Sequence, residues 1–136
     1  MGPIKVVIHG VMGKMGREVV NVVCAEADLT PVGAVSRSAQ PGVYTLPDGS
    51  GTIPLSNSLE DVVGGGQVVV DFTGAEGAMC AMRTAATHKV NLVTGSTGLT
   101  EADLEEAENL SQEHQIGIIV APNFALGAVL MIHLAK

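Results

Sequence analysis

The sequence predicts an α/β fold: a Rossmann-type, doubly wound parallel sheet with helices on both faces. Short β-branched runs alternate along the chain with longer stretches of helical period, which is the pattern of βαβ units. Two of the runs, 68–70 and 116–120, carry no polar side chain, as strands covered by helices on both sides require. A glycine-rich turn, 10–16, directly follows the first run, where this fold turns from its first strand into its first helix.

The hydrophobic pattern places the elements in alternation. Ser58 and Thr100 are predicted to be helix N-caps. Asp61 and Asp103 follow them three residues later, close to the arrangement of a capping box. The segment 38–57, rich in Pro and Gly, is predicted to be a long irregular loop, either part of a binding site or a surface insertion. Strands are predicted at 4–8, 30–35, 68–72, 92–94 and 116–120, and helices at 14–26, 58–63, 75–88, 101–114 and 124–135.

The composition describes one compact domain and excludes several classes of partner. The 136 residues are 46% hydrophobic and 15% charged, a balance that supports a buried core and differs from that of a disordered chain. A net charge of −7 and the absence of Trp argue against a nucleic-acid partner. No apolar run is long enough to span a membrane and the start has no signal-peptide pattern, so a cytoplasmic protein is predicted. Cys24 and Cys80 lie in helix-like apolar patterns and are predicted to be buried, reduced thiols.

The turn after the first strand predicts dinucleotide binding through Gly10, Gly13 and Gly16. A pyrophosphate must reach backbone N–H groups at the helix N-terminus, and a Cβ in the turn would block it. Gly10 would make the turn, Gly13 would admit the phosphates, and Gly16 would let helix and strand pack closely. Lys14 could reach a phosphate oxygen or stay solvated. The alternative is that the glycines only tighten a strand-to-helix corner.

Ser36 and Arg37 end the predicted second strand, about 20 residues past the glycine turn, where a NAD-specific site has an acidic residue. A carboxylate there would repel the 2′-phosphate of NADP, whereas a hydroxyl beside a guanidinium can bind it. NADPH is therefore the predicted cofactor, with NADH as the alternative. The other interpretation is that Arg37 is an unrelated surface cation.

Four segments, in order along the chain, resemble one family. They are VVIHGVMGKMGR at 6–17, VDFTGAEG at 70–77, TGSTGL at 94–99 and APNFALG at 121–127. Together they make the whole chain similar to the N-terminal, cofactor-binding domain of dihydrodipicolinate reductase (4-hydroxy-tetrahydrodipicolinate reductase), and the last segment looks like the cyanobacterial branch. Ser36 stands where members often have an acidic residue, and Ser96 where they often have Thr.

The resemblance implies a set of cofactor contacts at the carboxyl ends of the strands. The implied contacts are Gly10, Val11, Met12, Gly13, Lys14 and Met15 around the pyrophosphate, Ser36 and Arg37 at the adenosine ribose, Phe72 and Thr73 along the dinucleotide, Gly95, Ser96 and Thr97 at the nicotinamide ribose and ring, and Ala121, Pro122, Asn123 and Phe124 beside the nicotinamide.

The resemblance also implies a reaction and a second domain. NADPH would give a hydride to the unsaturated ring of a cyclic dicarboxylate in lysine and diaminopimelate biosynthesis. Residues 1–125 would form the dinucleotide-binding domain, and 126–136 the start of a hinge toward a substrate domain absent from these residues. The family's acid/base and substrate-binding residues lie in that second domain, and its homotetramers form through it. This chain is therefore expected to hold no catalytic residue, to be inactive alone and to be mainly monomeric.

No further chemistry is predicted. The four histidines are not paired with Ser or Cys in a nucleophile motif, and His9 is predicted to pack beneath the glycine turn. No cluster has metal-ligand spacing, so no metal is predicted. Two alternative functions remain: the cofactor domain of another NADP-dependent reductase, of the homoserine or aspartate-semialdehyde type, or a stand-alone, non-catalytic NADP(H)-binding module.

Overall fold

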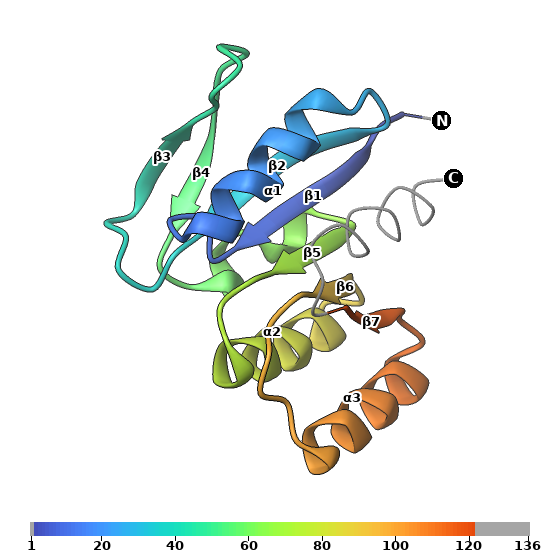
Figure 1. The fold of residues 1–136 in the computed structure, drawn as a ribbon. Helices are drawn as coiled ribbons and strands as arrows, with labels where there is room; N and C mark the ends of the chain where they lie inside the picture. The colour runs from blue at the N-terminus through green and yellow to red at the C-terminus, as the bar shows by residue number, and fades with distance from the viewer. Residues whose placement is uncertain (1, 122–136) are drawn as a thin grey trace.

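The protein is built on one seven-stranded sheet (Figure 1). The computed structural model describes residues 2–121. The strands are β1 (Ile4–His9), β2 (Leu29–Val35), β3 (Gly42–Thr45), β4 (Thr52–Ser56), β5 (Val68–Asp71), β6 (Asn91–Thr94) and β7 (Ile118–Val120). They lie in the order β3-β4-β2-β1-β5-β6-β7, and every neighbouring pair is parallel except β3 with β4. Without β3, the parallel strands follow the Rossmann order, in which the first and fourth lie side by side at the centre.

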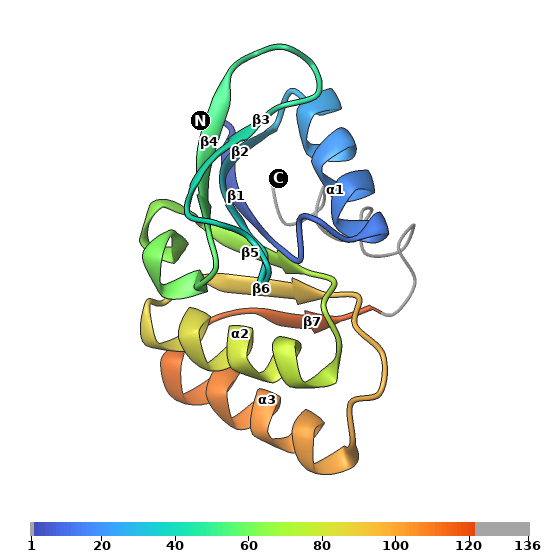
Figure 2. The same cartoon turned by 90° about the vertical axis from the view of Figure 1, so that its left-hand side faces the viewer.

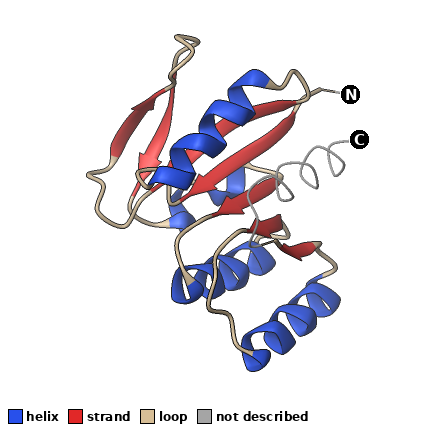
Figure 3. Cartoon of the chain, viewed as in Figure 1, coloured by secondary structure: helices blue, strands red, loops and turns tan. Residues whose placement is uncertain are grey.

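Helices cover both faces of this sheet, as predicted (Figures 2 and 3). α1 (Lys14–Ala25) lies on one face, and α2 (Ala75–Thr87) and α3 (Glu101–His114) lie on the other. Two short 3-10 turns, η1 (Leu59–Asp61) and η2 (Val63–Gly65), join β4 to β5. The mostly parallel sheet between helical layers confirms the predicted α/β, Rossmann-like class.

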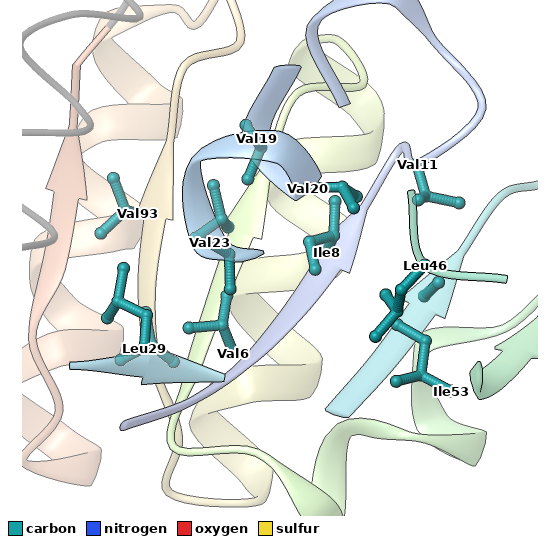
Figure 4. Packing of buried hydrophobic residues seen from close by; sticks show 13 residues of the cluster. Val6, Ile8, Val11, Val19, Val20, Val23, Leu29, Leu46, Ile53 and Val93 are labelled. Atoms are coloured by element: carbon teal, nitrogen blue, oxygen red, sulfur yellow. The ribbon is translucent and has the colours of Figure 1, made fainter. Parts of the chain in front are cut away.

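The sheet separates two hydrophobic clusters. Side chains of β1 alternate between them: Val6 and Ile8 point to the α1 side and Val7 to the α2 side, and all three are fully buried. On the α1 side they pack against Val20 and Val23 of the helix (Figure 4). In the cluster on the α2 side, Met79, Ala81, Met82 and Ala85 of the helix pack with Val and Leu side chains, several of them from the strands. Burial on both faces explains why the central strands carry almost no polar residues.

The prediction of an irregular loop over 38–57 is wrong. This segment contains β3 and β4, which pair antiparallel with each other, and β4 extends the parallel sheet by pairing with β2. Gly42 and Pro54 are poor strand formers, so the sequence pattern did not indicate strands here. Pairing with β2 through Leu55 and Ser56 stabilises β4 in spite of this composition. The chain thus uses β3 where this fold commonly has a crossover helix.

The predicted helix over 58–63 is also wrong, because these residues form η1 and η2. Ser58 makes no side-chain cap bond. Instead Ser56 Oγ donates to Asp61 and accepts from the Ser58 N–H at 3.1 Å. The predicted helices over 14–26, 75–88 and 101–114 are confirmed to within one residue, and the predicted strands are present to within two residues at each end. The helix predicted over 124–135 lies outside the described residues.

The capping box predicted at the start of α3 is present. Thr100 Oγ1 accepts from the Asp103 N–H at 3.1 Å, and the Asp103 carboxylate accepts from the Thr100 N–H at 3.0 Å. Thr100→Ala should lower the free energy of unfolding by about 1 kcal/mol, measured by urea denaturation followed by circular dichroism. Ser58→Ala is the matched control, since its hydroxyl makes no cap bond. Equal losses in the two variants would contradict the assignment.

Candidate functional site

A groove of about 810 Å³ runs along the carboxyl edge of the sheet. Its volume is in the range of small-molecule sites. It opens over the ends of β1 and β5, the neighbouring strands at which the strand order reverses, and open α/β sheets bind their ligands at this point. Four segments form its walls: residues 9–10 with Gly13 at the end of β1, residues 35–38 at the end of β2, residues 57–60 after β4, and residues 72–77 with Cys80 and Thr84 after β5 and on α2.

The three glycines of the turn after β1 have different surroundings. Gly10 has a φ of +94°, and a Cβ on it would lie 2.9 Å from the Phe72 carbonyl oxygen. A Cβ on Gly16 would overlap the Gly10 carbonyl. Gly13 lines the groove, and a Cβ there would lie 3.5 Å from its nearest neighbour, the Gly10 oxygen. Gly10 therefore lets the turn lie against Phe72 at the end of β5, and Gly16 lets α1 approach the turn. Gly13 leaves room for a ligand.

The N-terminus of α1 is open beside this turn. Its N-cap, Gly13, makes no side-chain cap bond, and its first turn contains no acidic residue. By contrast, α3 begins with a capping box and has Glu101 and Asp103 in its first turn. The first N–H groups of a helix have no acceptor within the helix, and together with the helix dipole they favour an anion. These groups fit the phosphates of a dinucleotide.

Asp71, at the end of β5, is the centre of a hydrogen-bond cluster. The strand register places it between His9 of β1 and Thr94 of β6. Asp71 Oδ1 lies 2.7 Å from His9 Nδ1 and accepts from Thr73 Oγ1 at 2.8 Å. Asp71 Oδ2 accepts from Thr94 Oγ1 and Ser96 Oγ, both at 2.7 Å. Groups from three neighbouring strand ends thus share one carboxylate.

The environment of Asp71 keeps its carboxyl ionised. The residue is fully buried. Burial raises the pKa of the carboxyl, but hydrogen bonds from His9, Ser96 and Thr94 together outweigh it, so the pKa lies below its ordinary value of 3.8. An ionised carboxylate only accepts hydrogen bonds. The proton between Asp71 and His9 therefore belongs to His9 Nδ1.

Ser96 connects Asp71 to the turn that leads into α2. While Ser96 Oγ donates to Asp71, the same oxygen accepts from the N–H groups of Thr73 at 3.1 Å and Gly74 at 3.0 Å. The turns after β5 and β6 are thereby fixed to each other. The Ser96 hydroxyl, which donates one hydrogen bond and accepts two, is therefore fully used by the protein.

The structure brings part of the predicted site together in the groove. Gly10, Gly13, Ser36, Arg37, Phe72 and Thr73 line it. The remaining predicted residues of the described chain, Val11, Met12, Lys14, Met15, Gly95, Ser96, Thr97 and Ala121, do not. Val11 is fully buried in the α1-side core and Met12 is 45% exposed. Pro122, Asn123 and Phe124 lie outside the described residues.

Sequence reasoning missed Asp71 and the far wall of the groove. Two signals in the sequence could have indicated Asp71: a carboxylate that ends an otherwise apolar run, and its place in the segment 70–77 that carries the resemblance. Glu76 and Cys80 of α2 form part of the far wall. Glu76 lies within the segment 70–77 that carries the resemblance, but neither residue was predicted to contact the cofactor. The prediction that both cysteines are buried is wrong, because Cys80 is exposed and Cys24 is only partly buried; both are free.

Both basic and acidic side chains line the groove. His9 and Arg37 are the basic ones, and Glu60 and Glu76 are the acidic ones. Glu60 also lies 2.9 Å from His88 Nε2. Within residues 2–121, no group of three or more His, Cys, Asp or Glu side chains is placed to hold a metal ion. In the same part of the chain, no helix has the length and apolar character needed to cross a membrane.

The Rossmann-like sheet, the groove over its switch point and the open helix behind a glycine turn define the class of nucleotide-binding domains. Residues 4–124 match the family model described as dihydrodipicolinate reductase, N-terminus. The chain belongs to the dihydrodipicolinate reductase family and corresponds to its N-terminal, cofactor-binding domain.

Relatives named 4-hydroxy-tetrahydrodipicolinate reductase match over the whole chain. One from Dehalococcoides mccartyi is 54% identical over 100% of this chain. One from Synechococcus elongatus is 35% identical over 98% of it, so the predicted special likeness to the cyanobacterial branch is wrong. The chain spans about half the length of these curated relatives, 52% in both cases.

Solved structures of two enzymes superpose on this chain. A dipicolinate-bound dihydrodipicolinate reductase from Paenisporosarcina sp. TG-14 superposes with a TM-score of 0.76 at 28% identity, covering 97% of this chain and 52% of that one. Homoserine dehydrogenase from S. aureus superposes with a TM-score of 0.71 at 18% identity, covering 88% of this chain and 32% of that one. The second likeness shows a shared fold.

Proposed function

We propose that this chain binds NADPH in the groove, as the cofactor-binding half of a 4-hydroxy-tetrahydrodipicolinate reductase. The observation that carries the proposal is the groove over the β1–β5 switch point, next to the open N-terminus of α1. The relatives with this name, of which the chain covers about half, support the choice of reaction. The bound nicotinamide would supply a hydride to the unsaturated ring of a cyclic dicarboxylate.

In this proposal, the parts of the cofactor lie along different segments of the groove and of its surroundings. The phosphates lie over Gly10 and Gly13, where first-turn N–H groups of α1 can donate to them. The adenosine end lies along 35–38 and 57–60. The nicotinamide end lies toward Phe72 and the turn after β6. The predicted contacts at Ala121, Pro122, Asn123 and Phe124 remain part of the nicotinamide side.

Arg37 favours NADPH over NADH in this site. It is exposed, lines the groove and follows Ser36, whose Oγ lies 3.3 Å from Ser38 Oγ. A guanidinium beside hydroxyl groups can hold a 2′-phosphate by charge-assisted hydrogen bonds. Because the chain carries a net charge of −7, attraction for a polyanionic cofactor must come from such local cations.

Arg37→Ala should weaken NADPH binding about tenfold or more and change NADH binding little, because only NADPH carries the 2′-phosphate. Isothermal titration calorimetry with each cofactor measures this, and the absence of Trp makes intrinsic fluorescence a poor reporter. Lys5→Ala is the matched control, since Lys5 is exposed at the other end of β1. Equal losses for both cofactors would remove the 2′-phosphate role of Arg37. Absence of binding by the folded wild-type chain would refute the proposed function.

Two further expectations rest on the proposal and stay predictions. The chain alone should not oxidise NADPH in the presence of the cyclic dicarboxylate, because the family's acid/base residues are expected in a second domain. It should also elute from a sizing column mainly as a monomer, and a stable tetramer would contradict this.

A further inference from the structure

His9 is a largely buried histidine at the end of the central strand β1. It ends β1 immediately before Gly10, and its side chain is only 14% exposed. Its neighbours in the pairing register are Val35 on one side and Asp71 on the other. Among the described strands, β1 is the one that contains a histidine. The His9 side chain also lines the groove.

The two ring nitrogens of His9 have different environments. Nδ1 carries a proton and donates a hydrogen bond to the buried Asp71 carboxylate, at a distance of 2.7 Å. Within residues 2–121, no hydrogen bond joins Nε2 to another protein atom. A histidine whose Nδ1 is anchored in this way has its ring orientation fixed by the carboxylate. Nε2 is then the ring nitrogen available to a ligand in the groove.

We propose that His9 is a further cofactor-binding residue, whose Nε2–H donates a hydrogen bond to the pyrophosphate of the dinucleotide. The inference rests on the proposed function and adds to it a contact that the glycine turn alone does not provide. His9 and the open α1 N-terminus then meet the pyrophosphate from two sides of Gly10. Asp71 acts as the positioning residue that holds the imidazole for this contact.

The proposal requires a doubly protonated imidazole in the complex. Ionised phosphate oxygens only accept hydrogen bonds, so Nε2 must carry a proton in order to donate one. Nδ1 keeps its own proton, through which it is hydrogen-bonded to Asp71. The resulting imidazolium lies between two anions, the carboxylate and the pyrophosphate. The other charged groups lining the groove are Arg37 from the end of β2, Glu60 from η1 and Glu76 from α2.

His9→Asn separates direct binding from a purely structural role. Asn can keep the hydrogen bond to Asp71, because its amide nitrogen takes the place of Nδ1, but it has no atom at the position of Nε2. We expect His9→Asn to melt close to the wild-type temperature and to bind NADPH about tenfold more weakly in calorimetry. The loss should persist with 2′-phospho-ADP-ribose, which keeps the pyrophosphate, and vanish with 2′-AMP, which lacks it. His114→Asn, at the end of α3 and away from the groove, is the matched control.

A second measurement does not depend on a variant. Nitrogen-15 NMR of the histidine side chains in the NADPH complex should show both nitrogens of His9 protonated. Wild-type affinity in His9→Asn, or an unprotonated Nε2 in the complex, would overturn the inference while leaving the proposed function intact. Wild-type protein that binds neither NADPH nor 2′-phospho-ADP-ribose would overturn both.

Discussion

Gly16→Ala is expected to destabilise the domain by about 2–3 kcal/mol and to abolish tight NADPH binding. The added Cβ would overlap the Gly10 carbonyl and come within 2.9 Å of the Val11 Cα. Both obstacles are backbone, so no side-chain rotation can relieve them, and α1 must move away from the turn. Urea denaturation followed by circular dichroism measures the stability, and calorimetry measures the affinity.

Gly13→Ala is the contrasting variant. A Cβ on Gly13 meets only ordinary contact at 3.5 Å, so the fold should keep nearly its full stability, while the methyl group enters the groove and weakens NADPH binding. Gly64→Ala, with nothing within 4 Å of the added Cβ, controls for glycine replacement as such. If Gly16→Ala matched Gly64→Ala in stability, the close approach of α1 to the turn would be wrong.

Asp71→Asn should cost about 3 kcal/mol of stability, because it removes the shared acceptor from a buried cluster of donors. Each carboxylate oxygen faces two donors: His9 and Thr73 on one side, Thr94 and Ser96 on the other. Whichever way the amide turns, its NH2 group meets two of them. Asp48→Asn is the control and should change little, because Asp48 lies exposed at the tip of the β3–β4 hairpin and accepts hydrogen bonds from Ser50 there.

The same replacement should change the response to acid. The pKa of Asp71 is lower in the folded protein than its ordinary value of 3.8, so the ionised carboxylate stabilises the fold above that pH. This contribution is lost as the pH falls below about 3.8 toward the lowered pKa. The wild-type protein should therefore lose stability over this range faster than Asp71→Asn, measured by urea denaturation at a series of pH values. Parallel curves for the two proteins would show that Asp71 carries no such contribution.

The sequence predicted what depends on local pattern. Helix 101–114 was predicted at its observed bounds, because its period and the Thr100 capping box are both local signals. β4 was missed because its strand character comes from pairing with β2, a contact between distant segments. Asp71 was missed for a related reason. Its importance arises when the register places His9 and Thr94 on either side of it, and no single stretch of sequence contains that information.

Among the described residues, β3 and β7 are the outermost strands of the sheet. Both are short: β3 has four residues and β7 has three. An edge strand offers unpaired N–H and C=O groups on which another chain can grow by strand addition, and shortness limits how many bonds such an encounter can form. Val43 of β3, 64% exposed, is the large apolar side chain that β3 presents to solvent. Val43→Lys would place a charge on this edge and should slow fibril formation under partly denaturing conditions without altering the fold.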